Sequence, residues 1–412
     1  MSLRIVLLQG PVGGFFRHLH GDLEAAGHRV RRLVFNGGDL AFARGRDYRI
    51  LRPDSHGYAR PLETEFGDWR PDAVILFGDE RPIHRAAIAA ARRIGIPVWC
   101  FEEGYIRPDH VTFERDGNNA NSRLAATFDP DRPPERSPPA PRLIGQTQAM
   151  GWAAMRYFIA MRTTMMFFPG YRHHRERKLV AEFVFWWRTF FRRAKAARHD
   201  ADMVARLASG TAPPFFLVAL QVHDDLQLRR HGRGWTTWSF VEMVLESFRR
   251  HAPPDTLLVV KSHPLDIGYG HHRRNLRDYI ADRDLDGRVW YLQAGPMGPI
   301  LRHARGLVTI NSTAGLVALA HDVPTMAFGA AFYHVDGLSP EPQGPEDLDR
   351  FWGDPPPVDS ERSLRFGAHI RASVLIPGSF YLPETWPGIA AAVLTRLAAP
   401  SPPITPNPSA DS

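Results

Sequence analysis

The sequence contains a single cysteine, Cys100, among 412 residues. One thiol excludes an intrachain disulfide framework and a cysteine-based metal cluster. No apolar run reaches the roughly 18–20 residues that a membrane-spanning helix needs. The apolar part of the N-terminal segment MSLRIVLLQG is too short for a secretion signal and is typical of a buried first strand. We therefore expect a cytoplasmic protein without disulfides.

Acidic residues are scarce in one segment of a chain whose net charge is +7. Residues 150–199 contain eleven Lys or Arg and only two Glu, so this segment is more positive than the chain as a whole. It also holds twelve of the 45 aromatic residues and five of the ten methionines. A general nucleic-acid binder spreads basic charge along its binding face. The confinement of the charge therefore argues against a nucleic-acid partner.

Apolar runs alternate with helical patterns in both halves of the chain. The first half contains RIVLLQG, PDAVILFGD and IPVWCFEEG, and the second contains PPFFLVALQ, DTLLVVKSHP and GLVTINSTAG. Such alternation with short connections predicts an α/β protein with parallel, doubly wound sheets. We expect two Rossmann-like domains facing a cleft, with a helical insertion.

Shifts in composition mark the expected boundaries. Residues 127–142 contain six prolines, which favours a linker or a surface crossing. The expected segments are a first Rossmann-like domain (1–126), a Pro-rich linker (127–149), a basic aromatic helical insertion (150–210), a second Rossmann-like domain (211–358), C-terminal helices (359–397) and a disordered tail (398–412).

Polar residues follow the expected strands, and ligands of open parallel sheets bind beyond the carboxyl ends of the strands. The turn after the first strand contains Gly10, Gly13 and Gly14 and does not match the dinucleotide pattern G-x-G-x-x-G. Its glycines allow a ligand to approach the backbone, or they form a tight turn without a ligand.

Glu102 and Glu103 follow the apolar run IPVWCF. At the edge of an apolar region a carboxyl group has a raised pKa and can act as an acid, a base or a nucleophile. Consecutive strand residues point to opposite faces, so one of the two can enter the cleft while the other has a structural role. The alternative is a pair of solvated loop glutamates.

The second half offers two turns suited to an anion. Asn311, Ser312, Thr313 and Gly315 join an apolar run to a helical pattern, where hydroxyl and N–H groups either bind phosphate or only cap the helix. A cation, a hydroxyl group and an imidazole follow another strand, and a proline stiffens the turn. These residues are Lys261, Ser262, His263 and Pro264.

A third group of polar residues, Gln221, His223 and Asp224, follows the strand FFLVAL. Asp224 and Asp225 lack D-x-D spacing, and no histidines have zinc-site spacing, so we expect no metal.

The basic aromatic segment suggests a membrane-surface helix, with aromatic rings in the headgroup region and cations on anionic lipid. The residues concerned are Trp186, Trp187, Phe190, Arg192, Arg193 and Lys195. The stretch MRYFIAMRTTMMFF (155–168) could act in the same way. The alternative is a helical hairpin packed on the first domain with its basic face in water.

Several motifs occur together and in a recognisable order: QGPVGGFFRHL, FNGGD, FGDERPIHRAAIAAARRIGIPVWCFEEGYIRPDHVT, LQVHDDLQ, VKSHP, HARGLVTINSTAGLVAL and PGSFY. In order and spacing the chain resembles bacterial capsule polysaccharide biosynthesis proteins of the KpsS/LipB type, which are related to KpsC. The resemblance runs from about residue 3 to about residue 385, apart from the linker and the insertion.

The resemblance implies a two-domain GT-B-like glycosyltransferase with the nucleotide in its C-terminal half. It implies a retaining β-Kdo transferase that moves Kdo from CMP-Kdo to a phosphatidylglycerol or lysophosphatidylglycerol acceptor. This reaction would start the poly-Kdo linker for capsular polysaccharide export. The enzyme would be peripheral on the inner membrane, with capsule extension and export proteins as further partners. No cofactor or metal is implied, since the donor is already activated.

The resemblance also implies roles for individual residues. Glu103 stands where related linker-extending enzymes carry the second acid of Glu-Asp-Gly-Phe, which makes it the expected nucleophile, with Glu102 or Asp79 as base. The CMP phosphate would be held by His263, Ser312 and Thr313, assisted by Lys261 and Ser262, with close approach permitted by Gly315. The candidates for pairing with the Kdo carboxylate are Arg81, Arg107 and His223.

Two other functions stay open at this level. A linker-extending β-Kdo transferase, or one using another CMP-activated acidic sugar, would carry the same motifs. A non-catalytic capsule assembly or export partner would bind a lipid-linked glycan without turnover.

Overall fold

The computed structural model describes residues 2–134, 137, 140–173, 179–222, 226–263 and 272–399. Within these ranges the side chains of 179–191, 193, 194 and 272–274 are not described. The described residues form two compact units. The first lies within Met1–Arg123, Arg136–Glu176 and Ile370–Ser412, and the second within Leu124–Glu135 and Arg177–His369.

The first unit is built on a seven-stranded sheet with the order β12-β6-β5-β4-β1-β2-β3. Its strands are β1 (Arg4–Leu7), β2 (Arg29–Val34), β3 (Tyr48–Ile50), β4 (Ala73–Phe77), β5 (Val98–Glu103), β6 (His110–Arg115) and β12 (Leu375–Pro377). The five strands from β1 to β5 are mutually parallel, whereas β6 runs antiparallel to β5 and to β12. Strand order reverses between β1 and β4, which is the position where doubly wound sheets bind ligands.

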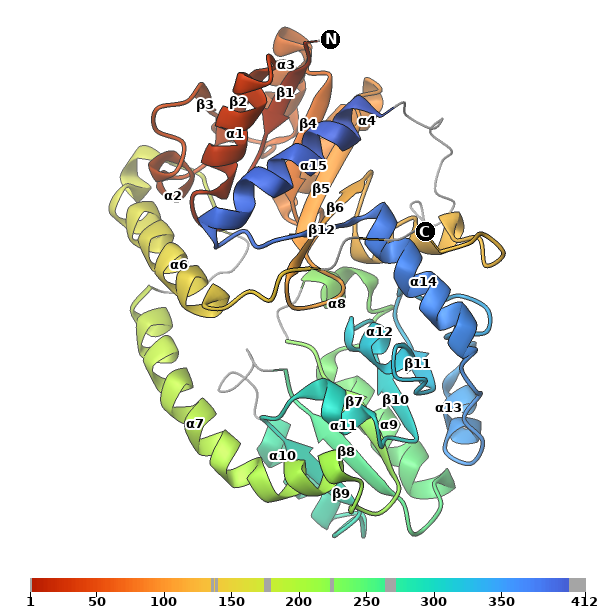
Figure 1. The fold of residues 1–412 in the computed structure, drawn as a ribbon. Helices are drawn as coiled ribbons and strands as arrows, with labels where there is room; N and C mark the ends of the chain where they lie inside the picture. The colour runs from red at the N-terminus through yellow and green to blue at the C-terminus, as the bar shows by residue number, and fades with distance from the viewer. Residues whose placement is uncertain are drawn as a thin grey trace. The chain divides into compact units, whose positions relative to one another are not determined.

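Helices cover both faces of this sheet. One face packs against α1 (Phe15–Ala25) and α15 (Trp386–Ala398), which lie side by side (Figure 1). The other face packs against α3 (Ala59–Trp69) and α4 (Pro82–Arg93). The remaining elements of the unit are α2 (Gly37–Ala41), α6 (Gln146–Thr163), η1 (Asn119–Asn121), η2 (Met165–Phe167) and η3 (Pro383–Thr385).

The second unit has a five-stranded, fully parallel sheet with the order β11-β10-β7-β8-β9. Its strands are β7 (Phe215–Ala219), β8 (Leu257–Lys261), β9 (Val289–Leu292), β10 (Gly306–Thr309) and β11 (Thr325–Ala327). Its helices are α5 (Leu124–Thr127), α7 (Leu179–Ser209), α8 (Leu226–His231), α9 (Thr237–His251), α10 (His272–Ala281), α11 (Met297–Leu301), α12 (Ala314–Leu319) and α13 (Pro345–Phe351), and α14 (Ser360–Ser373) begins there. The predicted α/β class, with two Rossmann-like domains, is confirmed.

The unit boundaries differ from the expected segments at two places. The segment 359–397 was expected to be separate C-terminal helices, but β12 pairs with β6 and α15 packs on α1, so residues from 370 onward complete the first unit. The insertion 150–210 is divided, since α6 belongs to the first unit and α7 to the second. Both differences come from contacts between residues distant in sequence, which composition does not reveal.

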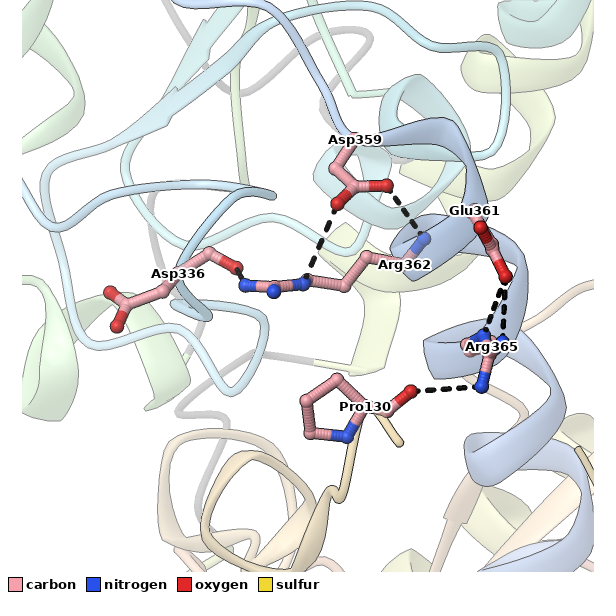
Figure 2. Close-up of polar contacts among 6 residues, drawn as sticks. All are labelled: Pro130, Asp336, Asp359, Glu361, Arg362 and Arg365. Atoms are coloured by element: carbon pink, nitrogen blue, oxygen red, sulfur yellow. Dashed lines mark hydrogen bonds and ion pairs between the residues drawn. The ribbon is translucent and has the colours of Figure 1, made fainter. Parts of the chain in front are cut away.

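Part of the Pro-rich segment is packed, although a linker was expected. Phe128 lies against Phe366 of α14, with ring centroids 5.0 Å apart. Figure 2 shows the polar contacts of the same helix: Arg365 donates to the carbonyl of Pro130 at 3.0 Å and pairs with Glu361. Arg362 donates to the carbonyl of Asp336 at 2.6 Å. The helix α14 therefore holds both this segment and the loop that contains Asp336 in the second unit.

Candidate active site

The two glutamates that end β5 lie on opposite faces of the first sheet. Residues of a strand alternate between faces, and Phe101 packs in the core beneath α1 and α15, whereas Cys100 packs in the core beneath α3 and α4. Glu103 therefore shares the face of α1 and α15, and Glu102 shares the face of α3 and α4. The parity of the strand directs the two side chains to opposite faces, as the sequence predicts, but both stand at the end of the strand, where the charge of Arg107 acts on each of them.

Glu103 is held by a tyrosine from the end of the chain. The hydroxyl of Tyr381 donates to Oε1 of Glu103 at 3.0 Å. Burial raises the pKa of Glu103, while the nearby positive charge of Arg107 and the hydrogen bond from Tyr381 oppose that rise. The carboxyl group thus has a fixed orientation and two groups that stabilise its negative charge.

Glu102 has a different environment. Its Oε1 accepts a hydrogen bond from the backbone N–H of Glu103 at 3.0 Å. Burial raises the pKa of Glu102 to about 7, against the opposing effect of that hydrogen bond. Its Oε2 faces Gly78, where an added Cβ would lie 3.5 Å away. A carboxyl group that titrates near neutral pH is suited to general acid–base catalysis.

Two arginines lie close to this pair. The Arg81 guanidinium lies 5.1 Å from the ring centroid of Phe77, and burial lowers the pKa of Arg81. Arg107 donates from Nε to the carbonyl of Gly104 at 3.2 Å and acts electrostatically on both Glu102 and Glu103. Both arginines predicted to contact the sugar carboxylate therefore lie beside the glutamates.

Asp79 occupies a structural position in spite of its predicted role as a base. It is 1% exposed, and its Oδ2 accepts from the backbone N–H of Asn118 at 3.0 Å and from Asn121 at 2.9 Å. Asn121 also donates to Glu80 at 2.9 Å. These contacts tie the loop after β6 to the loop after β4, which favours support of the site over proton transfer.

A further buried carboxyl group, Glu114 on β6, was not singled out from the sequence. It accepts hydrogen bonds from Ser122, from the backbone of Arg123 and from Tyr105, at 2.5, 3.1 and 3.1 Å. Burial raises its pKa to about 7. Tyr105 follows the two glutamates in the sequence, so this network fixes the segment that leads away from them.

A cavity of about 180 Å³ lies on the Glu103 face of the first sheet. Gly13 and Gly14 line it, together with Ala153 of α6, Tyr381 and Trp386. Gly13 has φ +117°, and a Cβ on Gly14 would lie 3.2 Å from the Trp386 ring. The two glycines therefore let the turn after β1 approach its neighbours and leave the turn at the edge of the cavity.

Gly10 has a packing role. A Cβ at this position would lie 2.6 Å from the ring of Phe16. The ring belongs to α1, so the absence of a side chain allows that helix to pack against the end of β1. This contact accounts for the glycine without a ligand.

The motif Asn36-Gly37-Gly38-Asp39 binds the helix α6. A Cβ on Gly37 would lie 2.7 Å from the carbonyl oxygen of Ala160, and one on Gly38 would lie 2.7 Å from the Tyr157 ring. The Tyr157 hydroxyl donates to buried Asp39 at 2.8 Å and accepts from Asn36 at 2.9 Å. The motif thus acts as a docking site for a helix of the same unit.

In the second unit, three of the predicted phosphate-binding residues lie at the carboxyl end of β8. Lys261 and Ser262 are buried, and His263 is half-buried. Burial lowers the pKa of Lys261, and the negative charge of Asp200 opposes this. Within the described part of the chain the Ser262 hydroxyl has no hydrogen-bond partner. A buried hydroxyl group without a partner is a candidate for binding a ligand.

The other predicted phosphate turn follows β10. Gln221, after β7, accepts from the backbone N–H of Asn311 at 3.1 Å, which joins the two strand ends at the switch point of the sheet. The Ser312 hydroxyl accepts from the N–H of Ala314 at 3.2 Å, whereas Thr313 makes no side-chain capping bond. The structure thus brings Gln221 and Asn311 together.

Gly315 is explained by a residue that the sequence did not single out. A Cβ on Gly315 would lie 2.5 Å from the ring of buried Tyr333, whose hydroxyl donates to the carbonyl of Ser312 at 2.7 Å. Because Gly315 has no side chain, the Tyr333 ring packs directly against it, and the hydrogen bond from Tyr333 to Ser312 stabilises the turn.

Several predicted residues lie outside the described part of the chain. These are His223, Asp224 and Pro264. The side chains of Trp186, Trp187, Phe190 and Arg193 are also outside it, although α7 includes their backbone. Arg192 and Lys195 are exposed on the same helix. No helix of the described chain has the length and apolarity needed to cross a membrane.

Comparisons with known proteins give a consistent result. Residues 72–381 match the family model described as "Capsule polysaccharide biosynthesis protein". The capsule polysaccharide modification protein LipB of Neisseria meningitidis is 35% identical, over 92% of this chain and 91% of that protein. The capsule polysaccharide export protein KpsS of Escherichia coli is 32% identical, over 92% and 97%.

Among solved structures, the chain matches Thermosulfurimonas dismutans KpsC, a beta Kdo 2,4 transferase. The identity is 14% and the TM-score 0.43, over 89% of this chain and 90% of the other. A likeness of this degree supports no conclusion about activity.

Proposed function

The chain belongs to the capsule polysaccharide biosynthesis family, and we propose that it is a retaining β-Kdo transferase. It moves Kdo from CMP-Kdo to a hydroxyl group of a phosphatidylglycerol-type lipid, which starts the linker on which capsular polysaccharide is exported. The observation that carries this proposal is the carboxyl pair at the end of β5, in which Glu102 and Glu103 have raised pKa values and separate partners.

In the first step Glu103 is the nucleophile. Its carboxylate oxygen forms a bond to the anomeric carbon of Kdo while the bond from that carbon to the CMP phosphate oxygen breaks and CMP leaves. Tyr381 and Arg107 support this role because they orient the carboxyl group and favour its ionised form. The product is a glycosyl ester on Glu103.

In the second step Glu102 is the base. It takes the proton of the acceptor hydroxyl as the hydroxyl oxygen attacks the anomeric carbon and the Glu103 carboxylate leaves. Two displacements at one carbon retain its configuration. A base with a pKa of about 7 is ionised in a large fraction of molecules at neutral pH and still accepts a proton effectively.

The second unit supplies the groups for the CMP phosphate in this proposal. A phosphate leaving group departs more easily when its charge is neutralised. Lys261 offers a buried positive charge, and Ser262 offers a hydroxyl group without a partner in the described chain. His263 and Thr313 complete the proposed set. The donor is activated already, so the proposal requires no metal.

The test is a transfer assay with purified protein, CMP-Kdo generated in situ and a fluorescent lysophosphatidylglycerol. Mass spectrometry of the lipid is expected to show a product heavier by one Kdo. A ladder of added sugars would assign the chain to linker extension. Absence of CMP binding would contradict the proposal and favour a non-catalytic capsule assembly or export partner.

A further inference from the structure

One short segment of the first unit carries most of the exposed large apolar side chains. In the described part of the chain eleven such side chains are exposed, and six of them lie between residues 152 and 167. They are Trp152, Met155, Ile159, Met165, Met166 and Phe167, with exposures of 66, 37, 51, 55, 79 and 64%. We call this group the α6–η2 stripe. Contiguous exposed apolar surface marks an interaction site more often than scattered residues do.

The helix that carries most of the stripe has two faces. Trp152, Met155 and Ile159 follow each other at spacings of three and four, which puts them on one side of α6. Tyr157 lies on the other side, buried between Asn36 and Asp39. The glycines of the Asn36–Asp39 motif allow this close packing. The exposed face is therefore held rigidly on the first unit.

The segment that carries the stripe has charged side chains of one sign only. Residues 140–173 contain four arginines and neither Asp nor Glu. All four, Arg142, Arg156, Arg162 and Arg172, are exposed. An apolar face flanked by arginines is complementary to a lipid surface that carries anionic headgroups.

The stripe adjoins the cavity on the Glu103 face. Trp152 belongs to both, and Arg156 lines the cavity from the next turn of α6. Tyr381 lines the same cavity and donates to Glu103. With a volume of about 180 Å³, the cavity suits a small headgroup.

We propose that the α6–η2 stripe seats the first unit on an anionic lipid surface, so that the headgroup of a lipid enters the cavity while its acyl chains stay in the bilayer. The role of the headgroup as acceptor rests on the proposed function, but the seating on lipid does not. The cavity that Trp152 lines and the absence of acidic residues from the segment 140–173 favour a lipid surface over a protein partner.

Binding to vesicles tests the seating directly. The full chain is mixed with vesicles of phosphatidylcholine alone, or with an equal amount of phosphatidylglycerol, and sedimented. The wild-type chain is expected to bind the anionic vesicles, less so at high salt. The double variant Met166→Ser, Phe167→Ser is expected to bind about tenfold more weakly or worse. Matched controls are Ile94→Ser and Leu364→Ser, which remove exposed apolar side chains elsewhere and should bind like wild type.

A spectroscopic measurement locates the contact. The only native thiol, Cys100, is fully buried, so a polarity-sensitive maleimide dye labels a new surface cysteine selectively. Dye on Met166→Cys is expected to shift to the blue when anionic vesicles are added, and dye on Leu364→Cys is expected not to shift. Equal shifts at both sites, or vesicle binding unchanged in the double variant, would overturn the proposal.

Two further outcomes separate the competing explanations. If the wild-type chain does not bind vesicles and forms a dimer that the double variant abolishes, the stripe is an interface between copies and the proposal fails.

Transfer to a deacylated, water-soluble glycerophosphoglycerol should survive in the double variant while transfer to vesicles falls. If the wild-type chain transfers sugar to neither acceptor but still docks through the stripe, the proposed function fails and the seating stands.

Discussion

The strand ends of the two units differ in how far the chain satisfies its own buried polar groups. In the first unit Asp79, Glu103 and Glu114 each accept a hydrogen bond from a named neighbour. In the second unit the Ser262 hydroxyl and Oδ1 of Asn311 are buried without a partner in the described chain. Polar groups that a fold leaves buried and unpaired are costly unless a ligand or water completes them. At these strand ends the first unit therefore satisfies its buried carboxyl groups within the chain, whereas the second leaves two polar groups that a ligand could complete.

The largest expected effect separates catalysis from donor binding. Glu103→Gln should lower the transfer rate about a thousandfold or more, because an amide cannot form the glycosyl ester. CMP affinity should stay unchanged, since the proposed phosphate ligands belong to the second unit. Initial rates and calorimetric CMP titrations measure the two effects. Glu103→Ala should be equally inactive and remain folded, and near-wild-type activity in Glu103→Gln would refute the nucleophile assignment.

A substitution in the second unit should affect donor binding instead of catalysis. Lys261→Met should weaken CMP binding about 10- to 100-fold, because charge-assisted hydrogen bonds contribute roughly 1.5–3 kcal/mol. The variant should fold, since a buried amine with a lowered pKa is replaced by an apolar side chain of similar length. Exposed Arg302→Met is the matched control for loss of a positive charge. Unchanged affinity in Lys261→Met would remove this residue from the donor site.

The pH dependence of transfer reports on Glu102. A base must be ionised, so the rate should fall about tenfold per pH unit below the pKa of about 7 and level off above it. In Glu102→Gln this acidic limb should disappear along with most of the activity. A rate profile from pH 5 to pH 9 checks the prediction, and an unchanged limb in the variant would assign the titration to another group.

The same group links pH to stability with a definite sign. The pKa of Glu102 in the folded chain lies above its ordinary value, so its contribution to stability is present at low pH and is lost as pH rises through about 7. Relative to wild type, Glu102→Gln should therefore be more stable at pH 8 than at pH 5. Denaturant unfolding at the two pH values measures this difference.

The smallest expected effect concerns the support of α6. Gly37→Ala should destabilise the protein by about 1–3 kcal/mol, because its Cβ would press against the carbonyl oxygen of Ala160. Gly67→Ala is the matched control in α3, where nothing lies within 4 Å of an added Cβ. The control should be neutral or up to about 1 kcal/mol more stable. Thermal unfolding distinguishes the two, and equal effects would contradict helix docking at this motif.

Local patterns predicted the elements whose burial follows from their own residues. The strands β1, β4, β5, β7, β8 and β10 are apolar runs ended by glycine or polar residues, and they were expected. In contrast, β6 alternates apolar residues with Thr112 and Glu114, whose burial depends on partners elsewhere. β12 has three residues and forms only because it pairs with β6.

The candidate site shows the same limit. The position of Glu102 and Glu103 at a strand end, on opposite faces, follows from the sequence. The partner of Glu103 does not, because Tyr381 lies 278 residues away. The motif PGSFY contains Tyr381 and was recognised in the sequence, but the motif alone does not predict which residue Tyr381 contacts. The packing of Tyr333 against Gly315 was not predictable for a similar reason, since local patterns do not reveal which side chain fills the space beside a glycine.

The most direct test of the account is to trap the glycosyl ester. The chain with Glu102→Gln lacks the proposed base, so the second displacement slows and the intermediate accumulates when CMP-Kdo is supplied. Proteolysis and mass spectrometry should then find one Kdo on the peptide that contains Glu103, and none when Glu103→Gln is added. A burst of released CMP with no adduct, or an adduct on another residue, would contradict the central claim.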